Sequence, residues 1–277
     1  MTPGVLYVVA TPIGNLADAT ERALEVLRRA DTVACEDTRV TRTLLARYGI
    51  ATPMTALHEH NEQEASAKLV EALLAGRSIA LVSDAGTPAI SDPGARLVAL
   101  AHHHRIRVCP VPGPSAAAAA FSAAGFTDGR FLFAGFLPPA GAARRAALEA
   151  LEAPVAVILY EAPHRIARTV DDLLARLGAA REIVIAREMT KKFEEIARMP
   201  LGEAPGWLKG APHREQGEFV LVLAPGNAPA ASAAIDPDAV LETLLEALKP
   251  SEAARIASKI TGAPKNALYR KALARRK

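Results

Sequence analysis

Eight side chains that can carry acid–base chemistry, nucleophilic chemistry or anion binding lie in short loops that directly follow apolar runs of this sequence. Because the carboxyl ends of strands in an open α/β sheet share one edge, such side chains are expected to converge on a cleft. Carboxylates and histidine can accept a proton there, and lysine or arginine can hold an anion. The eight are Asp37, Asp84, Ser115, Glu161, His164, Arg165, Glu188 and Lys191.

The longest of these loops lies between the apolar run Ile79–Val82 and Gly94. The apolar run predicts a buried parallel strand, and Pro93 suits the first turn of a helix, with Ser91 or Asp92 as its cap. Connections from a strand to a helix usually have two to six residues, so a longer ordered loop indicates a functional one. The alternative is an ordinary strand–helix turn.

Standard fingerprints of several enzyme classes are absent from the sequence. It has no G-x-G-x-x-G after its first apolar run, no P-loop, and no G-x-S-x-G, C-x-x-C or H-E-x-x-H. The segment His58-Glu59-His60 lacks the i, i+4 spacing of a zinc helix, so polar residues of a substrate cleft are the preferred interpretation and no metal is expected.

Composition predicts a cytoplasmic protein with a polyanionic partner. Half of the 277 residues are apolar, yet no run approaches a membrane span and no signal peptide is recognisable. Cys35 and Cys109 lie in apolar runs and read as buried free thiols. Residues 249–277 contain nine basic residues and one acid, a net charge of +8, which leaves −5 for the rest. A solvated basic helix is the alternative to a nucleic-acid-binding tail.

The pattern of elements predicts an α/β fold in three parts. Residues 1–125 alternate apolar strands and helices and end in the alanine-rich helix after Ser115; residues 130–225 hold more strands than helices, which predicts a mixed sheet. A Pro- and Ala-rich linker at 225–237 leads to three short helices at 236–277, similar to a helix-turn-helix, with Ser251 as a cap and Leu268 and Leu273 inward.

Five motifs in order resemble the ribosomal RNA small subunit methyltransferase I family of the tetrapyrrole methylase superfamily. The likeness extends from Val5 to about Leu223, and the helical tail resembles the family's C-terminal module. The motifs are Val9–Leu16, Cys35–Arg39, Ser83–Pro88, Pro112–Ala116 and Tyr160–Arg165.

The resemblance implies two α/β domains with a cofactor cleft between them and an S-adenosylmethionine-dependent enzyme. Its acceptor would be the 2′-hydroxyl of a cytidine ribose in the decoding region of 16S rRNA, its partner the 30S subunit, and its assembly a homodimer. By position, the cofactor contacts would be Asp84, Ala85, Gly86, Thr87, Pro88, Ser115, Ala116, Tyr160, Glu161 and Ala162, and the strand at 219–221 would flank the adenine.

A ribose hydroxyl is a poor nucleophile, so a group that accepts its proton would help. Glu188, Glu161, Asp37 and His164 are the candidates, with Lys191 as a cation that lowers the pKa of the hydroxyl. RNA contacts are expected at Arg39, Arg165, Lys259, Lys265, Arg270 and Lys271, although each cation near the cleft has a structural ion pair as its alternative.

Two other functions compete with this interpretation. A methyltransferase that acts on a tetrapyrrole carbon would share the fold but would not need a basic tail. A non-catalytic RNA-binding assembly factor would explain the tail but not the polar loops at the strand ends.

Overall fold

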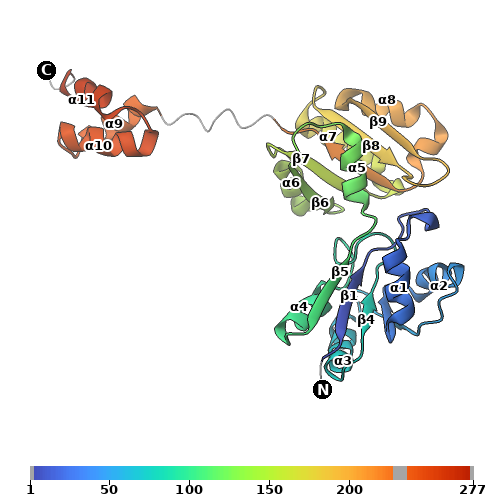
Figure 1. Ribbon diagram of the computed structural model, residues 1–277. Coiled ribbons are helices and arrows are strands. Elements are labelled where there is room, and N and C mark those ends of the chain that lie inside the picture. Colours follow the sequence, from blue (N-terminus) through green and yellow to red (C-terminus); the bar gives the residue numbers. More distant parts are fainter. Residues whose placement is uncertain (1–2, 227–235, 275–277) are drawn as a thin grey trace. The chain divides into compact units, whose positions relative to one another are not determined.

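The computed structural model describes residues 3–226 and 236–274 and divides into two compact units, Met1–Gly226 and Asn227–Lys277 (Figure 1). In the described residues the first unit contains two five-stranded sheets, and the second contains three helices. The α/β class and the separate helical module are thereby confirmed. Most of the expected linker, and the last three basic residues of the tail, lie outside the described residues.

The first sheet is entirely parallel. Its strands follow the order β3-β2-β4-β1-β5, and each neighbouring pair runs in the same direction. Strand β3 escapes prediction from sequence because its three residues are too few to show a period. The elements are β1 (Val5–Val9), η1 (Leu16–Asp18), α1 (Glu21–Arg29), β2 (Thr32–Cys35), α2 (Thr38–Arg47), β3 (Met54–Ala56), α3 (Glu62–Leu74), β4 (Ile79–Leu81), α4 (Ala95–His103) and β5 (Arg107–Val111).

Helices cover both faces of this sheet, which explains why its strands read as continuous apolar runs. One buried cluster joins Leu6 and Leu81 to leucines of α3 and α4. The other joins Val9 and Val33 to leucines of α1 and α2. The carboxyl ends of the strands are left as the edge from which the polar loops project.

Helix α4 begins differently from the sequence-based expectation. Its N-cap is Gly94, and the side chain of Glu62, at the start of α3, accepts hydrogen bonds from the backbone N–H groups of Gly94 (2.8 Å) and Arg96 (3.3 Å). The predicted cap by Ser91 or Asp92 is therefore wrong, because a carboxylate from a neighbouring helix takes that place. Asp92 remains in the loop, without a capping role.

The second sheet is mixed, as predicted. Its order is β6-β7-β10-β8-β9, with β6 and β7 parallel and the other pairs antiparallel. The elements are β6 (Phe131–Phe136), α6 (Gly141–Ala150), β7 (Ala156–Glu161), η2 (Pro163–Arg165), α7 (Ile166–Leu177), β8 (Glu182–Arg187), β9 (Glu195–Pro200), η3 (Leu201–Glu203), α8 (Ala204–Lys209), η4 (Pro212–Glu215) and β10 (Phe219–Leu223).

The alanine-rich helix α5 (Ala116–Ala124) packs on the second sheet, against β7 and β10 (Figure 1). Its buried alanines lie against Ile158 and Val222, while the opposite face of this sheet packs against α6, α7 and α8. The predicted boundary at residue 125 assigned this helix to the first domain. Its small side chains make one face suitable for close packing on a flat sheet, a property that the order of elements does not reveal.

The described part of the second unit comprises α9 (Pro237–Leu245), α10 (Pro250–Thr261) and α11 (Lys265–Ala274) around a small apolar core that includes Leu268. Two expectations are corrected. Ser251 does not cap α10, whose N-cap is Lys249 without a side-chain hydrogen bond. Leu273 is exposed, because Ala272, four residues after Leu268, takes the inward position.

Among the helices of residues 3–226 and 236–274, none combines the length and the apolar character that crossing a membrane requires.

Candidate functional site

A cavity of about 360 Å³ lies where loops from both sheets of the first unit meet. Its size falls within the range of pockets that hold small molecules. Nine of the ten expected cofactor residues line it, whereas Pro88 is buried and does not. The lining comprises Ile13, Asp84, Ala85, Gly86, Thr87, Ile90, Ser91, Asp92, Ser115, Ala116, Phe136, Tyr160, Glu161, Ala162, Pro163, Met189, Glu218, Phe219 and Val220.

The loop after β4 is fixed against the end of β1 by paired backbone hydrogen bonds. The N–H of Thr11 donates to the carbonyl of Gly86 (2.8 Å), and the N–H of Gly86 donates back to the carbonyl of Thr11 (3.0 Å). The Thr11 hydroxyl donates to the carbonyl of Ser83 (3.1 Å). Gly86 has φ +85°, and a Cβ there would come no closer than 3.5 Å to Ile13. The backbone conformation, rather than lack of space, therefore requires glycine.

Tyr160 forms part of the wall that the second sheet contributes. Its hydroxyl accepts a hydrogen bond from the N–H of Ala117 (3.2 Å), and its ring lies edge-on to Phe133 and Phe136, with centroids 4.9 and 5.7 Å away. Burial raises the pKa of the Tyr160 phenol, opposed by that hydrogen bond and assisted by the negative charge of Asp92. Tyr160, at β7, and Asp92, in the loop after β4, both line the cavity.

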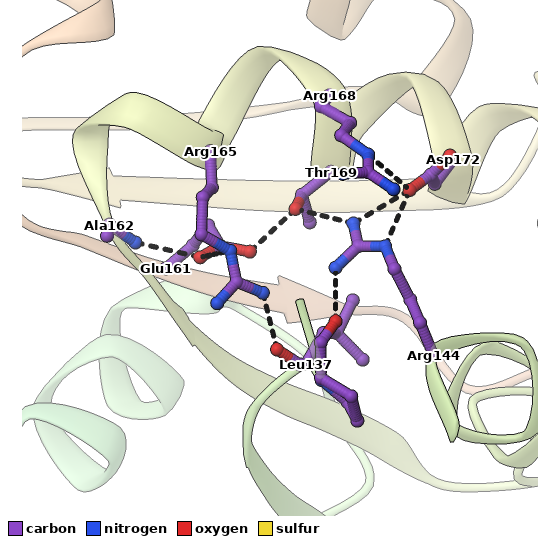
Figure 2. A network of polar contacts seen from close by, with 9 residues as sticks. Leu137, Arg144, Glu161, Ala162, Arg165, Arg168, Thr169 and Asp172 are labelled. Atoms are coloured by element: carbon purple, nitrogen blue, oxygen red, sulfur yellow. Dashed lines mark hydrogen bonds and ion pairs between the residues drawn. The ribbon is translucent and has the colours of Figure 1, made fainter. Parts of the chain in front are cut away.

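Glu161 lies at the end of β7 with its side chain fully buried (Figure 2). One oxygen, Oε1, accepts from the N–H of Ala162 (2.9 Å) and lies 3.2 Å from Nε of Arg165. The other accepts from the Thr169 hydroxyl at 2.6 Å, and Arg165 also donates to the carbonyl of Leu137. These contacts leave the carboxylate no access to a substrate, so the geometry favours a positioning role for Glu161 over that of a base.

Arg144 extends the same network to Asp172 of α7 (Figure 2). Its side chain is 4% exposed, forms an ion pair with Asp172 (2.7 Å) and donates to the Thr169 hydroxyl (2.9 Å) and the carbonyl of Pro138 (3.0 Å). Buried charge is tolerated only when it is paired and hydrogen-bonded. The network therefore ties the end of β7 to the loop after β6 and to α7.

Asp37 is also held by structural partners. It accepts from the N–H of Arg39 (2.7 Å) at the start of α2, and the Arg39 guanidinium contacts both of its carboxylate oxygens at 2.6–3.1 Å. These hydrogen bonds lower the pKa of Asp37 to about 2, which makes it a weak proton acceptor. His164 is exposed on η2 and does not line the cavity.

Glu188 and Lys191 form a tight pair in the turn after β8. Oε1 of Glu188 accepts from Nζ of Lys191 (2.8 Å) and from the N–H of Glu218 (3.0 Å). Burial opposes the change, but these hydrogen bonds hold the pKa of Glu188 below its usual value. Burial disfavours the charged form of Lys191, but its hydrogen bonds to Glu188 and Glu218 outweigh this effect, so the pKa of Lys191 is raised. Glu188 is thus adjacent to Met189 of the cavity, yet its carboxylate is already engaged.

Lys191 lines a second, more open hollow that the β1–α1 connection and the β8–β9 turn share. Its aliphatic stem packs on Gly14, where a Cβ would come within 2.7 Å of it. Exposed Arg47 and Lys192 lie on the same hollow. Of the expected catalytic residues, Glu161 therefore lines the cavity and Lys191 lines the second hollow, whereas Asp37, His164 and Glu188 line neither.

The cations expected to bind RNA differ in their exposure and in whether a carboxylate already pairs with them. Arg165 is committed to Glu161, as described above, whereas the Arg39 side chain is 85% exposed despite its pairing with Asp37. In the helical unit, Lys271 forms an ion pair with Asp238 (2.7 Å). Three further cations of that unit are exposed: Lys259, Lys265 and Arg270.

Asp92 is a cavity residue that the sequence-based search for catalytic groups overlooks. Burial and the charge of Glu36 raise its pKa to about 6, against a hydrogen bond with Ser83 and with a further contribution from Asp84. The signal in the sequence is the presence of two aspartates, Asp84 and Asp92, in one long strand-end loop. Because Asp92 is also a possible helix cap, the sequence analysis does not count it among the catalytic candidates.

Backbone strain is concentrated at the cavity. In residues 3–226 and 236–274, five residues other than glycine have positive φ, and four of them occupy two loops beside the cavity: Ala89, Ser91, Glu188 and Thr190, with φ between 50° and 66°. Such conformations cost free energy and cluster where the surrounding structure needs a particular side-chain direction. Both loops are therefore shaped for a function beyond chain connection.

Comparison with known proteins finds two matching family models. Residues 5–205 match "Tetrapyrrole (Corrin/Porphyrin) Methylases", and residues 231–276 match "RsmI C-terminal HTH domain". The relatives that carry the name Ribosomal RNA small subunit methyltransferase I include the following two. The one from Pseudomonas aeruginosa is 47% identical over 99% of both chains. The one from Mesorhizobium japonicum is 51% identical over 97% of this chain and 91% of its own.

Among solved structures, the uroporphyrin-III C-methyltransferase of Thermus thermophilus in complex with S-adenosylhomocysteine is similar in fold. The TM-score is 0.55 at 18% identity, covering 81% of this chain and 97% of that one. At this identity the likeness concerns the fold alone.

Proposed function

Because this chain belongs to the ribosomal RNA small subunit methyltransferase I family of the tetrapyrrole methylases, we propose that it transfers a methyl group from S-adenosylmethionine to RNA. The proposed acceptor is the 2′-hydroxyl of a cytidine ribose in the decoding region of 16S rRNA, within the 30S subunit. The observation that carries the assignment is the cavity at which strand-end loops of both sheets meet.

The residues of the cavity fit S-adenosylmethionine by their chemistry. Phe136, Phe219 and Val220 provide apolar surface for an adenine, and the carboxylates of Asp84 and Asp92 suit a sulfonium and an ammonium group. Ser115 precedes α5 without capping it, so the partial positive charge at that helix end suits a carboxylate. When bound, the cofactor supplies an activated methyl group.

The chain's own contribution is to align the acceptor with that methyl group and to handle a proton. Good alignment alone can supply roughly 7–11 kcal/mol. The hydrogen bonds between Thr11 and Gly86 hold the loop after β4, and the Glu161–Arg165–Thr169 network holds the end of β7. Both walls of the cavity are thus fixed before a ligand arrives, which is what alignment requires.

We propose that the helical unit grips RNA phosphates. Its exposed Lys259, Lys265 and Arg270 are available for this, as is Arg39 of the first unit. Each phosphate contact releases counterions, so binding should weaken with salt. An enzyme acting on rRNA would work in the cytoplasm.

A homodimer is also proposed. It is supported by exposed apolar side chains on the edge strand β6, where Phe131 and Leu132 are each 42% exposed. Covering such an edge with a second copy would remove apolar surface from water and protect unpaired backbone groups. Light scattering of the purified protein would measure the mass of the assembly.

Methyl transfer assays with two acceptors test the proposed function. The protein is incubated with S-adenosylmethionine carrying a labelled methyl group and either 30S subunits or uroporphyrinogen III. We expect label in the RNA alone. Label only in the tetrapyrrole would establish the alternative C-methyltransferase, and S-adenosylhomocysteine binding without transfer to either acceptor would refute the proposed acceptor. RNA binding without any cofactor affinity would favour an assembly factor.

A further inference from the structure

The two depressions of the first unit differ in the charge of their linings. Among the described residues, four carboxylates and no lysine or arginine line the cavity: Asp84, Asp92, Glu161 and Glu218. Three cations and no carboxylate of those residues line the second hollow, whose volume is about 640 Å³. A polyanion is therefore disfavoured at the cavity and favoured at the second hollow. The lining of the second hollow comprises Gly14, Asn15, Leu16, Ala17, Arg47, Tyr48, Thr190, Lys191 and Lys192.

A narrow wall separates the two depressions. In the β1–α1 connection, Ile13 lines the cavity and the next residue, Gly14, lines the second hollow. In the turn after β8, Met189 and Thr190 are divided in the same way. Consecutive Cα atoms are about 3.8 Å apart, so each of these segments passes from one depression to the other within one residue. Because every ribose of an RNA strand is bonded to phosphate groups, a ribose at the cavity would have a phosphate close to the second hollow.

Hydrogen bonds and ion pairs fix the walls of the second hollow. The Tyr48 hydroxyl donates to the carbonyl of Leu16, which ties the end of α2 to the β1–α1 connection. On the other side, Nζ of Lys191 lies 2.8 Å from Oε1 of Glu188 and 3.1 Å from Oε2 of Glu218. Two carboxylates already balance the charge of Lys191, so this lysine is part of the wall and not a free anion ligand.

Arg47 and Lys192 are the cations of the second hollow that can meet an anion. Both are exposed, and within residues 3–226 and 236–274 neither forms an ion pair with a carboxylate. Each lies over an aromatic ring, Arg47 at 5.9 Å from the centroid of Tyr48 and Lys192 at 5.4 Å from that of Phe193. Such a contact leaves the N–H donors available to a phosphate.

The Thr190 side chain is a further sign that the second hollow is built for a ligand. Its hydroxyl oxygen is buried and has no hydrogen-bond partner among the described residues. Its backbone has φ of 66°, which is a strained conformation for a β-branched residue. A Cβ on Gly14 would lie 3.0 Å from that oxygen, so the hydroxyl lies beside the β1–α1 connection. A buried polar group without a partner and a strained backbone are both typical of functional sites.

We propose that the second hollow binds a phosphate group of the RNA strand next to the acceptor ribose, and that Arg47 and Lys192 contact this phosphate. This site rests on the proposed function. The strand would then cross the wall between the two depressions, with the acceptor ribose at the cavity, where the methyl group is supplied. Arg47 and Lys192 bind the substrate and take no part in breaking or forming bonds.

The first test compares the double variant Arg47→Gln/Lys192→Gln with Arg145→Gln/Lys209→Gln, which removes an exposed arginine of α6 and an exposed lysine of α8. Losing hydrogen bonds to a charged group should weaken binding to 30S subunits about tenfold or more for each contact. KM for 30S subunits should rise accordingly, and the slope of log K against log salt should fall by about 0.7–0.9 for each contact. Affinity for S-adenosylhomocysteine should be unchanged, because neither residue lines the cavity. The control should match the wild type in all four measurements.

The variant Arg47→Lys/Lys192→Arg keeps both charges and should retain the salt dependence of the wild type. A glutamine variant with wild-type affinity and salt slope would overturn the site, and the proposed function would stand as long as the wild type methylates RNA. Weaker binding with an unchanged salt slope would also overturn it and would indicate contact with a ribosomal protein. A wild type that methylates no RNA would overturn the proposed function, and this site with it.

Discussion

Replacing Glu161 tests whether the buried network at the end of β7 is structural. The carboxylate accepts hydrogen bonds from Ala162 and Thr169, at 2.9 and 2.6 Å, and lies 3.2 Å from the Arg165 guanidinium, with no exposed side-chain surface. Glu161→Ala removes all three partners' contacts and leaves the Arg165 cation, 23% exposed, without its carboxylate.

Removing one member of a buried ion pair costs about 3–5 kcal/mol of folding free energy. Glu161→Gln keeps an oxygen that can accept hydrogen bonds but loses the charge, so we expect a cost of about 1–3 kcal/mol. Typical domains have only about 5–15 kcal/mol of stability, so the alanine variant should be markedly weakened. Because the end of β7 lines the cavity, the affinity of the Glu161→Ala variant for S-adenosylmethionine should fall as well.

Guanidinium unfolding of the two variants and of Glu149→Ala, an exposed glutamate on α6, gives the free energies. The control should stay within about 0.5 kcal/mol of the wild type. A loss below about 1 kcal/mol for Glu161→Ala would refute the structural role. A stable Glu161→Gln variant that binds the cofactor but has lost kcat would instead restore Glu161 as a catalytic candidate.

Three further predictions concern other parts of the chain. The folded state raises the pKa of Asp92 to about 6, so ionising its carboxyl group costs stability that is present at pH 4 and lost as the pH rises through 6. Asp92→Asn avoids this cost. Allowing for the partial exposure of Asp92, melting curves should show the variant more stable than the wild type by on the order of 1–2 kcal/mol at pH 7.5, with no gain at pH 4. Glu188→Gln can accept the same two hydrogen bonds, so steady-state kinetics should show kcat within about tenfold of the wild type, and a larger loss would make Glu188 the base. Deleting residues 227–277 should leave the cofactor affinity unchanged by calorimetry but weaken RNA binding and flatten its dependence on salt; unchanged RNA affinity would make the helical unit a packing element.

The elements that sequence predicts well are those in which local pattern and tertiary role agree. The buried strands β4 and β7 appear in the sequence as apolar runs because both of their faces are covered. The loop after β4 is recognisable by its length. The second sheet is recognisable as mixed because strands outnumber helices in its part of the sequence, and β8 and β9 follow each other without a helix between them.

The features that escape prediction depend on partners distant in sequence. The packing of α5 on the second sheet, the cap that Glu62 gives to α4, and the enclosure of Glu161 by Thr169 are all tertiary choices. Glu161 and Asp92 show the consequence most clearly. The sequence presents both as carboxylates near strand ends, yet one is locked in an ion pair and the other faces a cavity among acids, and only burial and neighbours separate their roles.

The most direct test of the account is to map methylation on 16S rRNA by mass spectrometry after 30S subunits are incubated with this protein and S-adenosylmethionine. The account predicts one added methyl group on the ribose of a single cytidine in the decoding region, and none when S-adenosylmethionine is left out. A methyl group on a base, on a ribose elsewhere, or on no nucleotide of the RNA would contradict it.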